Sequence, residues 1–399
     1  VTSRDMSLYH AATAVSRVDL KIANRLGENL LIDAEKFATI ANLLGAKYPE
    51  KALDKAWRQI LCGQHHDSIT GTHNEISFVD LMNSYREILE LGTDCLNRSI
   101  AFLGEAVRGD KKEQTYAVFN SLAWERTDVA QLSVSDVGAP NFSLRDPRGK
   151  NVAFEVLRVV RDAKGHVREA DIRFVAVKMP SLGYRAYTVV PKSSGTLPVC
   201  KTTDGRIIEN AFYRITVDPA RGGGISSIYD KTAKREIIES ANGHVGNELA
   251  ILEEVSYRNE TQHEFYTTGL KMFSGDTPAS VEIEQGAVSR TIRARYRMGE
   301  LCDVIQETTL FNDVPRIEFR TILVDVQREH YLYCVTFPTN LKGLSPIFDE
   351  RFGVVARNDS KNYLDFRTHQ MLMFGDCAVY AANKFMEYGS SAKVQIGRN

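Results

Sequence analysis

Apolar residues recur at helical spacing through the first hundred positions of the chain. The first stripe runs from residue 15 to residue 44, and Gly45 and Pro49 close it. Spacings of three and four residues bring such positions to one side of an α-helix. The pattern predicts one long helix that buries this stripe, whose members are Val15, Val18, Ile22, Leu26, Leu30, Phe37, Ile40 and Leu44.

Two more amphipathic stripes predict two further helices. Pro49 suits the first turn of the second helix, and Thr72 with Glu75 has the spacing of a capping box at the start of the third. Short connections between three such helices favour an antiparallel three-helix bundle over residues 1–107. The stripes are Ala52, Leu53, Ala56, Trp57 and Ile60, then Phe78, Leu81, Tyr85, Ile88, Cys95 and Leu103.

The pattern changes to strands after a polar stretch. The segment "RGDKKEQ", residues 108–114, has neither helical nor alternating periodicity and is predicted to be a linker. Beyond it, segments such as "DIRFVAVKM" and "TIRARYRM" alternate and are rich in β-branched and aromatic residues, with turn signals such as "DPRGK" between them. Many short strands without intervening helices predict a large antiparallel β-sandwich over residues 115–399. The fold class is multidomain, α followed by β.

Composition narrows the range of partners. The 399 residues carry 50 basic and 51 acidic side chains, so no broad field favours nucleic acid. No apolar run is long enough to span a membrane, and neither nucleic acid nor membrane is expected as a partner. Six cysteines without a CxxC pair argue against a zinc ribbon or a disulfide scaffold. The first residues contain neither an initiator Met nor a signal-peptide pattern and are typical of the interior of a longer protein.

The segment "GQHHDSITGTH", residues 63–73, carries the strongest candidate chemistry. Adjacent helical side chains point about 100° apart, so His65 and His66 can share one small site only where the backbone turns. Gly63 and Gly71 allow such a turn. Zinc sites need three or four ligands, and beyond Asp67 nothing nearby supplies more. By residue type alone, a metal site and ordinary surface side chains both stay open.

This segment resembles the signature of the glycoside hydrolase family 38 α-mannosidases. The preceding "SRVDLKIANRLGENLLIDAEKFATIANLLG" is similar to a helix of that family's middle domain. "AVFNSLAWERTDVAQL" and "ENAFYRITVDPARGGGISSIYDKTAKREII" resemble strands of its C-terminal domain, a mutarotase-like supersandwich. The resemblance implies a middle helical domain followed by part of the C-terminal β domain, without the family's N-terminal α/β catalytic domain.

The resemblance also implies roles for three residues. His66 corresponds to a ligand of the catalytic zinc, while Asp67 and His65 correspond to positions that line the sugar subsite. The other zinc ligands and the nucleophilic aspartate of the family belong to the preceding α/β domain. No residue of this chain is therefore assigned as catalytic, and the chain alone is expected to bind zinc weakly or not at all.

The resemblance therefore implies that this chain is a fragment of a retaining, zinc-dependent α-mannosidase. Such an enzyme hydrolyses terminal α-mannosides of oligosaccharides or glycoconjugates with two carboxyl groups, and the fragment alone is expected to be inactive. The alternative is a non-catalytic carbohydrate-binding or scaffold protein. A bacterial-type cytoplasmic location is expected from the cysteine usage and charge balance, with a lysosomal or secreted relative left open. Association into a homo-oligomer is also left open.

Overall fold

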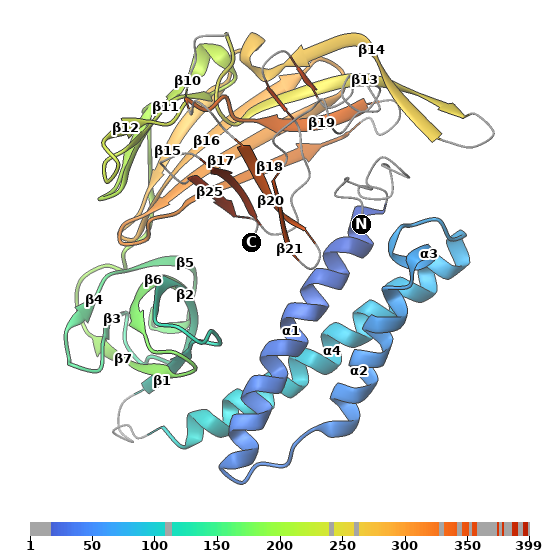
Figure 1. Cartoon of the computed structure of the whole chain (residues 1–399). Helices are drawn as coiled ribbons and strands as arrows, with labels where there is room; N and C mark the ends of the chain where they lie inside the picture. Colours follow the sequence, from blue (N-terminus) through green and yellow to red (C-terminus); the bar gives the residue numbers. More distant parts are fainter. Residues whose placement is uncertain are drawn as a thin grey trace. The chain divides into compact units, whose positions relative to one another are not determined.

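In the computed structural model the chain forms two compact units. Figure 1 shows their helices and strands. One unit comprises His10–Ala153 and Arg158–Leu197, and the other comprises Val1–Tyr9, Phe154–Leu157 and Pro198–Asn399. The predicted linker lies outside the described residues except for Gln114, so the predicted domain boundaries stay predictions. The structure describes residues 17–107, 114–238, 243–258, 263–326 and 331–340, and the strands within 345–397.

Helices precede strands, as the pattern predicted. The three long helices are α1 (Val18–Leu43), α2 (Glu50–Gly63) and α4 (Glu75–Glu105), and a short helix, α3 (His66–Ile69), lies inside the histidine segment. The long helices share one apolar core. Its most deeply buried side chains come from all three helices and include Leu31, Ala34, Leu53, Ala56, Ile60, Tyr85 and Ile88.

The predicted buried face of α1 was wrong over the first turns of the helix, whereas Phe37 of the predicted stripe is buried. Val18, Ile22 and Leu26 are 58%, 54% and 53% exposed. The buried row runs along the opposite side and is made largely of small residues. A Cβ on Gly27 would already lie 2.9 Å from the Ile60 side chain of α2. Helices that approach this closely require small side chains at the contact. A pattern of large apolar residues does not indicate such a face. The buried residues of α1 are Leu20, Ala23, Asn24, Gly27, Leu31, Ala34, Phe37, Ala38 and Ala41.

The start of α4 also differs from the prediction. The N-cap is Asn74, whose side-chain oxygen accepts a hydrogen bond from the Ser77 backbone N–H at 2.9 Å. Thr72 instead donates its hydroxyl to the Asp67 carbonyl at 3.2 Å. Asn and Thr are both good capping residues. Because the Thr72 hydroxyl bonds to the Asp67 carbonyl, the side chain of Asn74 caps the helix.

The first seven strands lie in the same compact unit as the helices, except for the first half of β5, Phe154–Leu157, which belongs to the other unit. One sheet has the order β1-β7-β3-β4, and a second has the order β2-β6-β5. Phe119 of β1 packs edge-on against Phe37 of α1, with ring centroids 5.6 Å apart. The strands are β1 (Gln114–Phe119), β2 (Arg126–Ser135), β3 (Asn141–Arg145), β4 (Asn151–Val152), β5 (Phe154–Arg161), β6 (Val167–Met179) and β7 (Tyr184–Lys192).

The second unit is built from antiparallel ladders, as expected. Its largest sheet has the order β18-β17-β16-β15-β8, and β12-β11-β10-β9 and β14-β13-β19 are further sheets. The strands are β8 (Lys201–Thr203), β9 (Ile207–Glu209), β10 (Tyr213–Asp218), β11 (Gly224–Asp230), β12 (Arg235–Glu236), β13 (Glu248–Arg258), β14 (His263–Phe273), β15 (Ser280–Gln285), β16 (Ser289–Met298), β17 (Cys302–Phe311), β18 (Ile317–Val324) and β19 (Tyr331–Thr336).

Short strands complete the description of this unit. Four of them form a sheet of order β21-β20-β24-β25, and β22 pairs with β23. They are β20 (Ser345–Glu350), β21 (Gly353–Ala356), β22 (Met373–Phe374), β23 (Cys377–Ala378), β24 (Phe385–Gly389) and β25 (Val394–Gly397).

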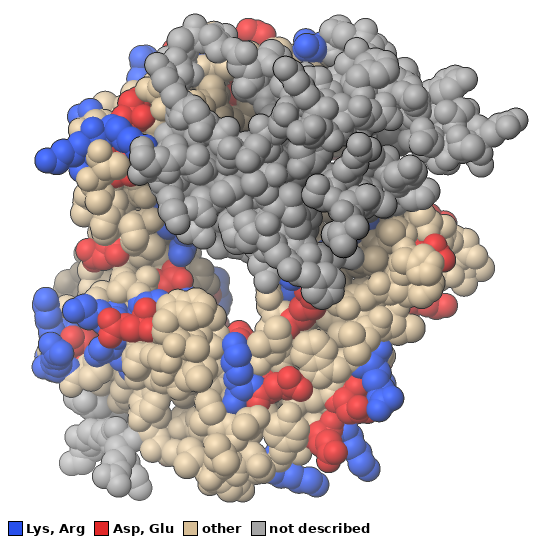
Figure 2. Space-filling model, in the orientation of Figure 1, with Lys and Arg blue, Asp and Glu red and all other residues tan. Residues whose placement is uncertain are grey.

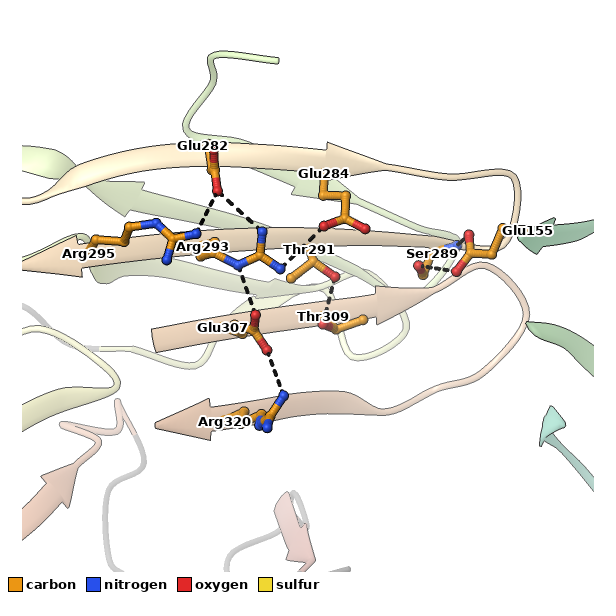
Figure 3. A network of polar contacts seen from close by, with 10 residues as sticks. All are labelled: Glu155, Glu282, Glu284, Ser289, Thr291, Arg293, Arg295, Glu307, Thr309 and Arg320. Carbon is orange, nitrogen blue, oxygen red and sulfur yellow. Dashed lines mark hydrogen bonds and ion pairs between the residues drawn. The ribbon is translucent and has the colours of Figure 1, made fainter. Parts of the chain in front are cut away.

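The two faces of the five-stranded sheet differ. Alternate residues of β16 and β17 enter an apolar core, while the other face carries a polar ladder (Figure 3). Arg293 donates to Glu307 at 2.9 Å, to Glu282 at 3.2 Å and to a third carboxylate, Glu284, at 3.3 Å. One guanidinium thus cross-links three adjacent strands, and its five N–H donors make this arrangement possible.

Glu155 fixes the turn at one end of this sheet. Its carboxylate is fully buried and accepts from the backbone N–H groups of Val288 and Ser289, both at 3.1 Å. The Ser289 hydroxyl donates to it at 2.8 Å (Figure 3). A buried carboxylate is tolerated only when donors surround it, so these contacts tie the segment Phe154–Leu157 to the β15–β16 turn.

The exposed surface agrees with the charge balance of the sequence. Figure 2 shows basic and acidic side chains interspersed over the visible described surface. Among the described helices, none is long and apolar enough to cross a membrane. Among the described residues, the free thiols are Cys62, Cys95, Cys200, Cys302 and Cys334.

The Glu155 contact predicts a strong effect of Gly286→Ala. The new Cβ would lie 1.9 Å from a Glu155 carboxylate oxygen, so the carboxylate must leave its donors. We expect the free energy of unfolding to fall by about 2–3 kcal/mol, as for an overpacked core. Urea denaturation measures this change.

Gly104→Ala serves as the control, because no atom lies within 4 Å of a Cβ at that helical position. Its stability should equal or slightly exceed that of the parent chain. Equal urea midpoints for Gly286→Ala and the parent chain would contradict the role given to Glu155.

Candidate functional site

The histidine segment lies at a corner between two helices. Helix α2 ends at Gly63, and Gln64 still has helical backbone angles. His65 has φ −52° and ψ 141°, which is extended backbone, and α3 begins at His66. The chain therefore turns at His65, which meets the condition under which both histidines can face one place.

His65 uses one ring nitrogen to hold this corner. Its Nδ1 accepts a hydrogen bond from the Asp67 backbone N–H at 3.3 Å, so His65 is the N-cap of α3. In a neutral imidazole one nitrogen carries the proton and the other accepts. With Nδ1 as the acceptor, the proton of neutral His65 lies on Nε2, and neither nitrogen is then a free ligand while the cap persists.

His66 and Asp67 lie beside His65 and are open to solvent. The two imidazole rings have centroids 4.2 Å apart, and His66 Nε2 lies 3.4 Å from an Asp67 carboxylate oxygen. The side chains of His66 and Asp67 are 81% and 69% exposed. Potential ligand atoms of all three residues lie within 4.8 Å of one another.

The spacing of this cluster suits part of a zinc site. Zinc binds nitrogen and oxygen at about 2.0–2.2 Å in tetrahedral geometry, which places neighbouring ligand atoms about 3.4 Å apart. The His66 and Asp67 atoms have that separation, 3.4 Å. Imidazole nitrogen and carboxylate oxygen are both ordinary zinc donors. The residues therefore fit a zinc ion as a partial ligand set. His66 and Asp67 offer donor atoms, and His65 adds one only when its hydrogen bond to the Asp67 N–H opens.

The rest of the segment closes a compact loop behind these side chains. The Thr70 hydroxyl donates to the His66 carbonyl at 2.5 Å, and the two threonine hydroxyls, of Thr70 and Thr72, are 3.1 Å apart. Gly71 has φ +80°, a left-handed conformation that glycine adopts without strain. These contacts leave the histidine and aspartate side chains on the outside of the loop.

His73, the third histidine of the segment, does not join the cluster. Its ring stacks on Phe78, with centroids 5.9 Å apart, and its Nδ1 lies 3.2 Å from the Asn74 carbonyl oxygen. Its position at the start of α4 is consistent with a structural side chain.

Gly63 is required at the end of α2 because Tyr85 of α4 comes very close. A Cβ on Gly63 would lie 2.6 Å from the Tyr85 hydroxyl oxygen. The Tyr85 side chain is buried and donates its hydroxyl to Asn24 at 3.2 Å. Burial raises the pKa of Tyr85 to about 12, and the nearby Glu28 and Cys62 add to the shift.

Comparisons with known proteins place this corner in a family. Residues 8–103 match the family model described as "Alpha mannosidase middle domain", and residues 208–392 match "Glycosyl hydrolases family 38 C-terminal domain". The chain is a homologue of the family 38 α-mannosidases. The resemblance of the sequence to this family is thereby confirmed, and the histidine segment lies within the middle domain.

Curated relatives agree with this assignment to the α-mannosidases. Alpha-mannosidase 2C1 of Mus musculus is 24% identical over 363 residues, a match that covers 88% of this chain and 31% of the relative. Alpha-mannosidase G of Dictyostelium discoideum is 21% identical over 383 residues, covering 87% of this chain and 33% of the relative. The chain thus spans about a third of the length of these α-mannosidases.

The fold is also similar to that of a solved structure. The crystal structure of an α-mannosidase from Enterococcus faecalis superposes with a TM-score of 0.72 and 15% identity, covering 96% of this chain and 48% of the other. At this identity the likeness concerns the fold alone. The arrangement of helices followed by antiparallel sheets is shared with an α-mannosidase.

The buried phenol of Tyr85 predicts a dependence of stability on alkaline pH. Because its pKa is raised from 10 to about 12, the folded state keeps the proton, and the stabilisation is present below pH 10. It is lost as the pH rises from 10 towards 12, at up to about 1.4 kcal/mol for each pH unit. Urea denaturation of the parent chain and Tyr85→Phe over this range measures the difference.

The parent chain should lose stability relative to Tyr85→Phe as the pH rises. Parallel stability curves for the two proteins between pH 10 and 12 would contradict the burial of this phenol.

Proposed function

We propose that this chain contributes one zinc ligand and part of the sugar subsite to a retaining α-mannosidase. The observation that carries the proposal is the 3.4 Å separation of His66 Nε2 and the Asp67 carboxylate, in a segment that lies within the matched middle domain. The relatives are α-mannosidases by name, and a mannose-containing oligosaccharide or glycoconjugate is the proposed substrate.

His66 is the proposed metal ligand among the three residues. Its side chain is more exposed than that of Asp67, and its Nε2 lies 3.4 Å from the Asp67 carboxylate. His65 keeps its Nδ1 on the backbone N–H of Asp67 and therefore orients the corner and lines the subsite. Asp67 can accept a hydrogen bond from a sugar hydroxyl, as a carboxylate acceptor next to the metal position.

The catalytic carboxyl groups are proposed to come from another domain of the enzyme. A retaining glycosidase needs a nucleophile and an acid/base on either side of the anomeric carbon, with the two carboxyl groups about 5–5.5 Å apart. Asp67 is the sole carboxylate in the described cluster of potential metal ligands. A bound zinc ion would supply Lewis acidity and orient sugar hydroxyls. The residues of this chain bind and orient, and the bond-breaking groups lie elsewhere.

Zinc binding tests the role of His66. The chain should bind zinc weakly, and His66→Ala should reduce the affinity at least 10-fold, because an imidazole of the ligand set is lost. Isothermal titration calorimetry or competition with a chromogenic chelator measures the dissociation constant. Equal affinities of His66→Ala and the parent chain would refute the assignment.

His166→Ala is the matched control for this test. His166 also lies near an aspartate, Asp162, at 3.7 Å, and the two side chains are 36% and 42% exposed. It directly precedes β6 and does not belong to the cluster. Its replacement should leave the zinc affinity unchanged.

An activity assay tests where the carboxyl groups lie. The 399-residue chain with added zinc should not hydrolyse p-nitrophenyl α-mannoside above the rate of buffer, since the described residues of the cluster include one carboxylate, Asp67, and a retaining enzyme needs two. Hydrolysis that His66→Ala abolishes and His166→Ala retains would show that the chain itself contains the catalytic groups. That result would overturn the proposed division between domains.

A further inference from the structure

A polar network from α1 reaches the residue directly before the two histidines. Glu28 of α1 accepts a hydrogen bond from the side-chain amide of Gln64 at 2.7 Å, through its Oε1. The same oxygen accepts from the Asn24 amide at 3.2 Å. Gln64 is the residue at which α2 gives way to the corner at His65. One carboxylate oxygen of α1 therefore holds the end of α2.

The network continues into the core between the helices. Asn24 is 9% exposed, and its side-chain oxygen accepts from the hydroxyl of the buried Tyr85 of α4. The Tyr85 hydroxyl occupies the space that a side chain at Gly63 would need. The path Tyr85, Asn24, Glu28 and Gln64 thus joins all three long helices at the position where α2 ends. Hydrogen-bonded polar groups in such a half-buried place fix one arrangement of the groups they join.

The end of a helix needs this kind of support. The last carbonyl groups of a helix have no intrahelical partner, and the final turn frays readily. Here the His65 N–H donates to the Cys62 carbonyl at 3.1 Å, and the Ser68 and Ile69 N–H groups both donate to the His65 carbonyl at 2.9 Å. These bonds form only while the chain turns at His65. A tether on Gln64 restrains the backbone one residue before that turn.

We propose that Glu28 is a positioning residue for the zinc ligand His66. Through Gln64 it holds the corner at His65 in the conformation that places His66 beside Asp67. The proposal rests on the proposed function for its link to zinc, but the positioning itself concerns the metal-free chain. Groups that orient metal ligands typically change the metal affinity 10–100-fold when they are removed.

The chain offers a matched contact that should not have this effect. Glu87 of α4 accepts from the side-chain amide of Gln59 at 2.5 Å and also pairs with Lys55. It is therefore another glutamate that joins a glutamine of α2 to a second helix. Gln59 lies inside α2, so this contact braces the helix without touching the corner.

Hydrogen exchange of the metal-free chain tests the positioning directly. Glu28→Ala removes both bonds to Oε1 and should accelerate exchange of the amides of His65, Ser68 and Ile69 at least 10-fold. Glu28→Gln keeps an oxygen acceptor for Gln64 and Asn24 and should restore slow exchange. Glu87→Ala should leave these amides as in the parent chain. Unchanged exchange in Glu28→Ala would overturn the proposal, whatever the zinc affinity.

Zinc titration of the same four proteins tests the link to the ligand. Glu28→Ala should raise the dissociation constant about 10-fold, whereas Glu28→Gln and Glu87→Ala should bind like the parent chain. Faster exchange in Glu28→Ala with an unchanged zinc affinity would overturn the positioning of His66. Equal weakening by Glu87→Ala would do the same, because it would show a general effect of stability. Absence of zinc binding by the parent chain, with exchange as expected, would support the positioning of the corner and overturn the prediction that the chain alone binds zinc.

Discussion

The helical part of this protein depends on the close approach of three helices at glycine. A Cβ at Gly27 of α1 would lie 2.9 Å from Ile60, one at Gly63 of α2 would lie 2.6 Å from Tyr85, and one at Gly92 of α4 would lie 2.9 Å from Leu30. Each helix thus presents a glycine to a large side chain of a neighbouring helix. Interiors packed to this density leave no space for a side chain at these positions, so the glycines set the distances between the helices.

These distances explain why the end of α2, which carries the candidate site, is fixed in position. Because α2 lies against Tyr85 up to its last residue, its end is fixed relative to α1 and α4, and Glu28 can reach Gln64. The chain then turns at His65, and the side chains of His66 and Asp67 project into solvent. A helical scaffold that is rigid near the corner suits a site whose donors must be preorganised before a metal or sugar binds. The exposure of the cluster agrees with a site that another protein surface completes.

The sequence alone offers the candidate residues but not the contacts that surround them. His65, His66 and Asp67 follow one another in one segment, and the structure brings their ligand atoms within 4.8 Å of one another. Gln64 was overlooked although it lies in the same segment, because an amide carries no catalytic chemistry. Glu28 could not be found at all: it is 36 positions from Gln64, and only the packing of α1 on α2 brings the two together.

By itself the sequence determined the order of helices and strands, the positions of the helices and the family. These follow from local periodicity and from motifs, which depend on neighbouring residues along the chain. Tertiary structure alone decided which face of α1 is buried, because large apolar side chains at Val18, Ile22 and Leu26 stay exposed while small residues allow the helices to meet. It also decided that Asn74, not Thr72, caps α4 and that Glu28 supports the histidine corner. Such choices depend on which surfaces fit at close range, and that fit involves residues far apart in the sequence.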